Sequence, residues 1–93
     1  MNYQDLYLLI KIVECGSFSQ AARRLGMSTS TLSRRIQNLE SSVGSRLIRR
    51  SARHLSLTQA GSLLFQRSQA LYNELENISL SVEQEVDSPS GEL

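Results

Sequence analysis

Residues 25–44 constrain the fold more than any other stretch, because they join two amphipathic helical patterns through a break of only three residues. Gly26 suits the left-handed position after a helix end, and Ser28 suits the cap of the following helix. Apolar side chains then recur at spacings of four, three and four, which places them along one helix face: Leu32, Ile36, Leu39 and Val43. We therefore predict a helix-turn-helix whose second helix spans residues 29–43.

The opposite face of this second helix has the chemistry of a DNA recognition helix. It carries hydroxyls, a guanidinium and an amide, and no acidic side chain precedes Glu40. Arginine and glutamine can each form two hydrogen bonds with a purine edge. We expect the helix to enter the major groove, with contacts on and beside it from Arg23, Ser28, Thr29, Ser30, Thr31, Ser33, Arg34 and Gln37. Helices joined by a glycine turn also occur in other helical domains, so the turn alone leaves that alternative open.

The distribution of charge favours a polyanionic partner. Residues 17–73 contain nine arginines and one acid, whereas residues 74–93 contain six acids and no base. The formal net charge of +1 therefore hides a basic block beside an acidic end. All bases of the block are arginine, whose planar guanidinium can pair with phosphate through two hydrogen bonds.

The composition argues against an enzyme and against a metal site. One cysteine and one histidine provide neither a disulfide nor a set of metal ligands, and Cys15 is expected to be a small buried hydrophobe. A phosphate-binding glycine loop, a carboxylate pair and a nucleophile–base pair are missing, so no cofactor is expected in this fragment. Without a signal peptide or an apolar run of about eighteen residues, we expect a cytoplasmic protein that does not contact a membrane.

Two shorter helices are predicted, one on each side of Gly16. Asn2 is a good cap for a helix over residues 3–15. A second helix, over residues 19–25, begins either after a capping box opened by Ser17 or later, at Ser19. The side chains expected to face inward on this second helix are Phe18, Ala21, Ala22 and Leu25.

Residues 46–57 have the pattern of a β-hairpin, which after a recognition helix would be a wing. The apolar pair at 47–48 and the alternation at 55–57 predict two short strands, with both leucines of the second strand on one face. The segment between them is basic. Its expected contacts with the flanking minor groove or the DNA backbone come from Arg49, Arg50, Arg53 and His54. An irregular surface loop is the alternative.

A long helix is predicted over residues 58–86, capped by Thr58. Residues at alternating spacings of four and three form a coiled-coil seam: Leu64, Ser68, Leu71, Leu75, Ile78 and Val82. At 1.5 Å per residue the helix would extend roughly 40 Å, too far to be buried in a domain of this size. We expect dimerisation with a second copy through Leu64, Leu71, Leu75, Ile78 and Val82. A helix elsewhere in a longer parent chain is the alternative partner.

A series of residues in a fixed order and spacing extends over nearly the whole chain. It comprises Phe18, Ser19, Gln20, Ala21, Ala22, Leu25, Ser28, Leu32, Ser33, Arg34, Ile36, Leu39, Glu40, Gly44, Leu47, Arg50, Arg53 and the run Leu57, Thr58, Gln59, Ala60, Gly61. On these residues the sequence resembles the N-terminal DNA-binding domain of LysR-type transcriptional regulators. The resemblance implies a mainly α fold, a winged helix-turn-helix followed by a linker helix that pairs two subunits, and binding to double-stranded DNA.

The same resemblance implies a longer bacterial protein. Members of the family carry a C-terminal effector-binding domain, which this sequence does not include. The full-length protein would therefore bind a small-molecule effector and could assemble as a tetramer. The chain departs from the family at Thr29, Ser30 and Thr31, where Gln-Pro-Ala is common, and at Ile48, where phenylalanine is usual. An operator preference of the family is therefore not transferred to the first base-contacting positions.

These patterns predict three parts. Residues 1–57 form the winged helix-turn-helix, residues 58–86 the dimerisation helix, and residues 87–93 a flexible linker toward the effector-binding domain. The alternative from another class is a helical adaptor module that binds protein and whose arginines only solubilise it. Oligomeric state cannot separate these hypotheses, because both predict a dimer.

Overall fold

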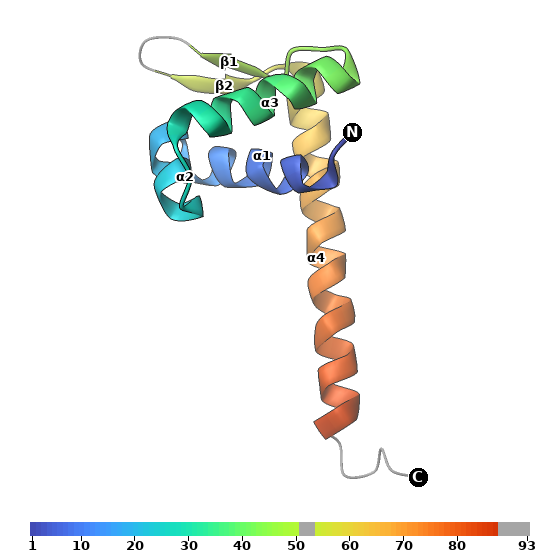
Figure 1. Ribbon diagram of the computed structural model, residues 1–93. Helices are drawn as coiled ribbons and strands as arrows, with labels where there is room; N and C mark the ends of the chain where they lie inside the picture. Colours follow the sequence, from blue (N-terminus) through green and yellow to red (C-terminus); the bar gives the residue numbers. More distant parts are fainter. Residues whose placement is uncertain (51–53, 88–93) are drawn as a thin grey trace.

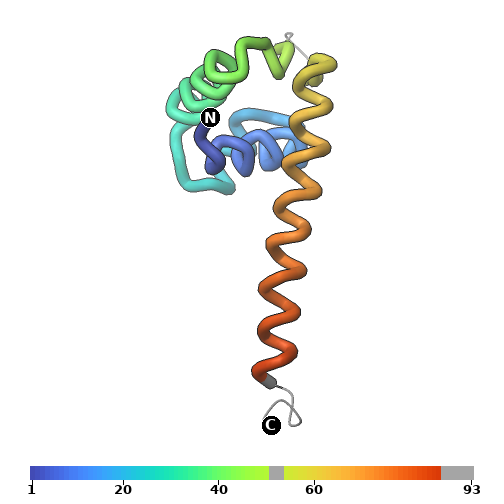
Figure 2. Tube along the Cα trace, turned by 90° about the vertical axis from the view of Figure 1, so that its right-hand side faces the viewer, coloured from blue at the N-terminus to red at the C-terminus, as the bar shows by residue number. Residues whose placement is uncertain are grey.

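The computed structural model describes residues 1–50 and 54–87, and its fold is mainly helical with a small antiparallel wing (Figure 1). The elements follow in the order α1 (Tyr3–Cys15), α2 (Phe18–Leu25), α3 (Thr29–Val43), β1 (Ile48–Arg50), β2 (Leu55–Leu57) and α4 (Gln59–Asp87). The first three helices and the wing pack into one body, and α4 crosses this body and continues past it (Figure 1 and Figure 2). The predicted winged helix-turn-helix with a long last helix is confirmed.

Side-chain caps determine where the first helices begin. The amide oxygen of Asn2 accepts a hydrogen bond of 2.9 Å from a backbone N–H in the first turn of α1. The hydroxyl of Ser17 accepts one of 3.2 Å from the N–H of Gln20, so α2 starts at Phe18 and the earlier of the two predicted starts is correct. Gly26, between α2 and α3, has a φ of 69°, a left-handed conformation that a β-carbon disfavours.

The hydrophobic core lies between α1, α2, α3 and the start of the wing. Ala21 and Ala22 are buried on α2, and their small side chains allow neighbouring helices to approach closely. The predicted stripe of α3 is buried except at Val43, which is 38% exposed because it borders an open groove beside α4. Cys15 is half-buried at the edge of the core. The buried cluster comprises Leu6, Leu8, Leu9, Ile12, Phe18, Ala21, Ala22, Leu32, Ile36, Leu39, Leu47 and Ile48.

The wing is an antiparallel hairpin in which Ile48 pairs with Leu57 and Arg50 pairs with Leu55. Directly paired residues share a face of a sheet, and successive residues alternate between faces. Arg50 therefore lies on the inward face with Ile48, and Arg49 lies on the outward face. The prediction that Arg49 and Arg50 lie in the basic segment between the two strands is wrong, since both belong to β1. Residues 51–53, including Arg53, lie outside the described residues.

Glu40, the single acid of the basic block, fixes the entry into the wing. Its Oε2 accepts hydrogen bonds from the backbone N–H of Leu47 at 2.8 Å and of Ile48 at 3.2 Å. The carboxylate thus satisfies backbone donors just before and at the start of β1, where the second strand provides no partner. Its role is structural, and it connects the last turn of α3 to the wing.

The start of α4 is capped as predicted. Thr58 Oγ1 accepts a hydrogen bond of 3.0 Å from the backbone N–H of Gly61 and donates one of 2.6 Å to the carbonyl oxygen of Arg46. The helix has 29 residues, which corresponds to roughly 43 Å at 1.5 Å per residue. The residues after Asp87, which the sequence predicts to be a linker, lie outside the described part of the chain.

The two ends of the predicted seam on α4 lie in different environments. Ser68 is 2% exposed, and Leu64 packs at the edge of the core, so both face their own domain. The placement of Ser68 on a seam facing a partner is therefore wrong. Periodicity did not distinguish the two cases, because one stripe of α4 passes from the core to solvent. The large apolar residues that are exposed beyond this point are Leu71, Leu75, Ile78, Leu80, Val82 and Val86.

Candidate nucleic-acid interface

The outward face of α3 presents polar side chains to solvent. Thr29, Ser30, Arg34 and Gln37 are exposed, and Ser33 is half-buried between them. Leu32, Ile36 and Leu39 hold the opposite face of the helix in the core. The side chain of Arg34 has no hydrogen bond or ion pair with any other described residue. Its donors are therefore available to an external partner.

The hydroxyl groups at the start of α3 are partly used by the helix itself. Ser28 Oγ accepts the backbone N–H of Thr31 at 3.1 Å and donates to Thr31 Oγ1 at 2.8 Å. Ser30 Oγ lies 3.3 Å from Ser28 Oγ. Of the predicted contacts, Ser28 thus caps the helix, and the hydroxyl of Thr31 accepts a hydrogen bond from Ser28. Residues 28–30 are exposed, so the positive end of the helix dipole faces solvent, which favours an anion there.

Arg35, next to Arg34, points to the other side of the helix. Its Nε and Nη2 lie 2.9 Å and 2.8 Å from Oδ1 of Asp5, a carboxylate that is almost completely buried. The pair joins α3 to α1. No partner for Asp5 could be predicted from the sequence, because a separation of thirty residues provides no local signal that identifies one.

The wing contributes two basic side chains with different surroundings. Arg49 is exposed on the outward face, without a side-chain partner among the described residues. Arg50 places its guanidinium carbon 3.6 Å from the ring centroid of Phe18 and donates from Nη2 to Ser33 Oγ at 2.7 Å. His54 is exposed at the start of the return segment. The strand alternation in the sequence could have shown that Arg50 faces inward, since Ile48 lies two residues earlier.

A small hollow of about 180 Å³ separates α3 from the wing. Arg46 and Arg50 line it, together with Gln37 and Glu40 of α3. Arg23, one of the predicted DNA contacts, is exposed in the last turn of α2. Basic side chains thus lie on three different elements, α2, α3 and β1. Each of these elements could contribute a contact to a DNA backbone.

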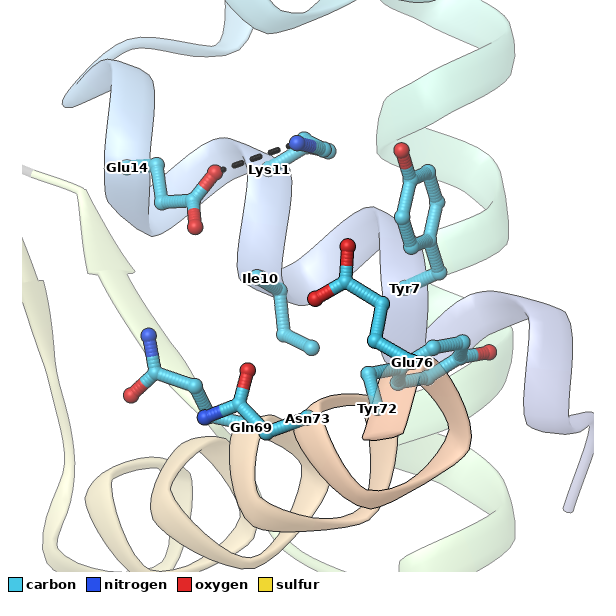
Figure 3. A pocket seen from close by; sticks show the side chains of 8 residues that line it. All are labelled: Tyr7, Ile10, Lys11, Glu14, Gln69, Tyr72, Asn73 and Glu76. Atoms are coloured by element: carbon cyan, nitrogen blue, oxygen red, sulfur yellow. Dashed lines mark hydrogen bonds and ion pairs between the residues drawn. The ribbon is translucent and has the colours of Figure 1, made fainter. Parts of the chain in front are cut away.

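A second hollow, between α1 and α4, has a different character. It encloses about 320 Å³ and is lined by Tyr7, Ile10, Lys11, Glu14, Gln69, Tyr72, Asn73 and Glu76 (Figure 3). Lys11 donates a hydrogen bond of 3.2 Å to Glu14, and this bond, with the charge of Glu14, raises the pKa of Lys11. The ammonium group of Lys11 is already paired, and the carboxylates of Glu14 and Glu76 line the hollow. This hollow therefore does not suit a polyanion.

Other kinds of site are not found in the described part of the chain. No group of histidine, cysteine, aspartate and glutamate side chains there could hold a metal ion. None of the helices over residues 1–50 and 54–87 combines the length and apolar character needed to cross a membrane.

The short helix α2, the glycine turn, the exposed face of α3 and the following hairpin together define a winged helix-turn-helix DNA-binding domain. Residues 3–62 match the family model described as bacterial regulatory helix-turn-helix protein, lysR family. The chain belongs to this family. The predicted resemblance is thereby confirmed.

Individual relatives agree with this assignment. A regulator described as an HTH-type transcriptional regulator from Xanthomonas campestris pv. campestris is 39% identical over 92 residues, which cover 99% of this chain and 27% of that protein. The HTH-type transcriptional regulator CrgA of Neisseria meningitidis is 40% identical over 74 residues, covering 80% of this chain and 25% of that protein. The chain thus spans about a quarter of the length of these relatives.

Solved structures share the fold. The DNA-binding domain of BenM in complex with catB site 1 DNA superposes with a TM-score of 0.85 at 28% identity, covering 95% of this chain and 98% of that one. The structure of CrgA, a LysR-type regulator from Neisseria meningitidis, gives a TM-score of 0.75 at 36% identity and covers 90% of this chain and 29% of that one.

Proposed function

We propose that this domain binds specific double-stranded DNA sites as a homodimer and belongs to a bacterial transcriptional regulator, without enzymatic activity of its own. The observation that carries the proposal is the exposed polar face of α3, which a buried opposite face holds in position and on which Arg34 has no partner among the described residues. The DNA complexes known for structurally similar domains support it. Because DNA would be its partner, we propose a cytoplasmic location.

In the proposed complex, α3 enters the major groove. Thr29, Ser30 and Gln37 are exposed beside Arg34, and these side chains offer hydrogen bonds to base edges. The hydroxyl of Ser28 caps the helix and donates to the hydroxyl of Thr31, so both residues would contact DNA through the helix end and not as independent base-contacting groups. Arg23 would meet the phosphate backbone from α2.

The wing would follow the DNA beside the major groove. Arg49 is exposed on its outward face and His54 is exposed at its second segment. Both suit a phosphate or a flanking minor groove, and Arg53 remains a prediction from the sequence for the same contact. Two separate elements would thus contact one half-site.

We also propose that dimerisation uses α4. Leu71, Leu75, Ile78 and Val82 are between 46% and 58% exposed along one face, an arrangement that a partner helix would bury. This face is in line with an apolar groove of about 430 Å³ bordered by Val43, Ser45, Leu47, Ala60, Leu63, Leu64 and Arg67. Leu64 would then contribute from the groove and not from the exposed stripe.

The charges of α4 favour an antiparallel arrangement of the two copies. Arg67 is its sole base and lies in the N-terminal half, whereas Glu74, Glu76, Glu83 and Glu85 follow it. A parallel pair would place like charges side by side, and an antiparallel pair would bring the acidic half of one helix to Arg67 of the other. The relatives are several times longer than this chain, so we propose that the whole protein also contains an effector-binding domain and could form a tetramer.

Selection from a pool of random duplexes tests the proposed DNA binding. If the domain binds specific DNA sites, the selected duplexes should share a sequence. The affinity for them should fall by roughly 10³- to 10⁵-fold between 50 and 200 mM salt if about six to ten phosphates are neutralised. A protein-binding adaptor would enrich no sequence, and any affinity for duplex DNA would be weak. Absence of enrichment at low salt would reject the proposed function.

A further inference from the structure

We propose that Arg50 is a positioning residue, which holds the wing against the recognition helix through Phe18 and Ser33. The proposal rests on the DNA-binding function proposed above and adds a specific device to it. The sequence alone suggested a direct DNA contact for Arg50, in common with Arg49. The structure separates the two side chains, because they lie on opposite faces of the hairpin.

The contacts of Arg50 join three elements at one point. Its guanidinium carbon lies 3.6 Å from the ring centroid of Phe18, the first residue of α2. Its Nη2 donates a hydrogen bond of 2.7 Å to Ser33 Oγ, on the outward side of α3. β1, α2 and α3 are therefore linked by a single side chain.

An arginine can make both contacts together because its charged group is planar. The face of the guanidinium stacks on the aromatic ring while its edge donates a hydrogen bond. A lysine at the same position would keep the charge, but it has no planar face to stack. Arg50→Lys therefore separates the effect of the charge from the effect of the geometry.

Arg50 makes the second of two contacts that attach β1 to the helices. Glu40 accepts the backbone N–H groups of Leu47 and Ile48 at the base of the wing. Arg50 lies two residues farther along β1 and contacts α2 and α3 there. Two points of attachment fix the direction of the hairpin, whereas one would leave it free to pivot. A wing already oriented in the free domain loses less conformational freedom on binding DNA.

The first test examines the contact without DNA, by NMR of the 93-residue chain. Side-chain protons of Arg50 should be shifted upfield by the ring of Phe18, and the shift should disappear in Phe18→Leu. If this variant does not fold, Ser33→Ala provides a second test, since loss of the hydrogen bond should reduce the shift. Arg50→Lys should raise the exchange rates of the wing amides by about 5- to 30-fold. Unshifted Arg50 protons and unchanged exchange would overturn the proposal.

The second test measures affinity for the duplex most enriched by the wild-type chain. Arg50→Lys should weaken binding by about 5- to 30-fold, with an unchanged dependence on salt, because the charge is retained. The matched control, Arg24→Lys, changes an exposed arginine in the last turn of α2 to which no DNA contact is assigned, and it should lose less than about threefold because the charge is kept. In a Ser33→Ala background the additional loss from Arg50→Lys should be much smaller, because the hydrogen bond is already absent.

The outcomes separate the two proposals. If the Arg50→Lys variant binds the duplex within about twofold of the wild-type affinity, only the charge of Arg50 matters. Arg50 would then be a phosphate contact, and the positioning role would be overturned. If the wild-type chain enriches no duplex, the DNA-binding function fails, and the NMR comparison alone then decides whether Arg50 holds the wing.

Discussion

Asp5 of α1 and Arg35 of α3 are joined through one carboxylate oxygen, which lies 2.9 Å from Nε and 2.8 Å from Nη2 of the arginine. Asp5 is 5% exposed, whereas the neighbouring Arg34 is exposed and unpaired among the described residues. Adjacent residues of a helix differ in direction by about 100°. Two consecutive arginines therefore have opposite roles, one anchoring the recognition helix and the other available to DNA.

Arg35→Ala should lower the free energy of unfolding by about 2–4 kcal/mol, because it leaves a buried carboxylate without its partner. The double variant with Asp5→Ala should lose less than the sum of the single changes, since no unpaired charge remains. Urea denaturation followed by circular dichroism measures both effects. Arg34→Ala is the control and should stay within about 0.5 kcal/mol of the wild-type chain. An Arg35→Ala variant as stable as this control would contradict the anchoring role.

Arg34→Ala should weaken binding to the selected duplex by about 1–3 kcal/mol and relax discrimination at central positions of the half-site. Arg34→Lys keeps the charge but loses the planar fork, so it should retain the salt dependence and still lose discrimination. Affinities are measured on duplexes altered either in the half-site or in its flanks. Equal losses on all duplexes would assign Arg34 to phosphate and leave base recognition to Thr29, Ser30, Ser33 and Gln37.

Leu71→Asp combined with Leu75→Asp should convert the proposed dimer to a monomer in sedimentation experiments. The two residues are half-exposed in the single chain, and dimerisation would bury an unpaired charge at each, which costs several kcal/mol. Asn73→Asp with Asn77→Asp adds the same charges to another face of α4 and should leave the dimer intact. A Leu71→Asp, Leu75→Asp variant that still sediments as a dimer at micromolar concentration would place the interface elsewhere.

Gly61→Ala should destabilise the fold by about 1–3 kcal/mol. A β-carbon at Gly61 would overlap the carbonyl oxygen of Leu47 and lie 2.9 Å from the carbonyl carbon, and backbone atoms cannot rotate away as a flexible side chain can. Thermal unfolding measures the effect. Gly44→Ala gives the comparison, since its β-carbon meets nothing within 4 Å and only the left-handed backbone opposes it, at about 1 kcal/mol. Unchanged stability of Gly61→Ala would show that α4 can move away from the wing.

Ser68→Ala should stabilise the domain by about 0.5–2 kcal/mol, because the buried hydroxyl has no hydrogen-bond partner in the described structure and alanine favours helix. Ser79→Ala, at an exposed position of the same helix, controls for helix propensity. Both variants are compared by chemical denaturation. A Ser68→Ala variant less stable than the wild-type chain would indicate that the hydroxyl has a partner, such as a buried water.

The elements and their ends could be predicted because their signals are local. Asn2, Ser28 and Thr58 cap helices through bonds to residues two or three positions away, and the sequence displays such pairs directly. The outward face of α3 followed from the same principle, since the spacing of its apolar residues determines which side chains remain exposed.

The contacts between elements could not be predicted, because their partners are far apart in the sequence. Arg50 meets Phe18 and Ser33 only after the wing has folded back along α3. Ser68 illustrates another limit, since its heptad position is the same whether the neighbouring surface belongs to its own domain or to a second copy. Periodicity specifies a face of a helix, but tertiary packing decides what covers that face.

The length of α4 makes the domain sensitive to events at its far end. After Gly61 the helix contains neither glycine nor proline, so nothing in it favours a bend. A rotation of about 5° at the end of a rigid rod of roughly 43 Å displaces the opposite end by roughly 4 Å. Two half-sites on one side of a duplex are separated by about 34–36 Å per helical turn, and a displacement of that size at each copy would alter which spacing fits. A change of a few degrees in the angle between the paired α4 helices could therefore change the half-site spacing that the two copies bind, without any rearrangement inside either domain.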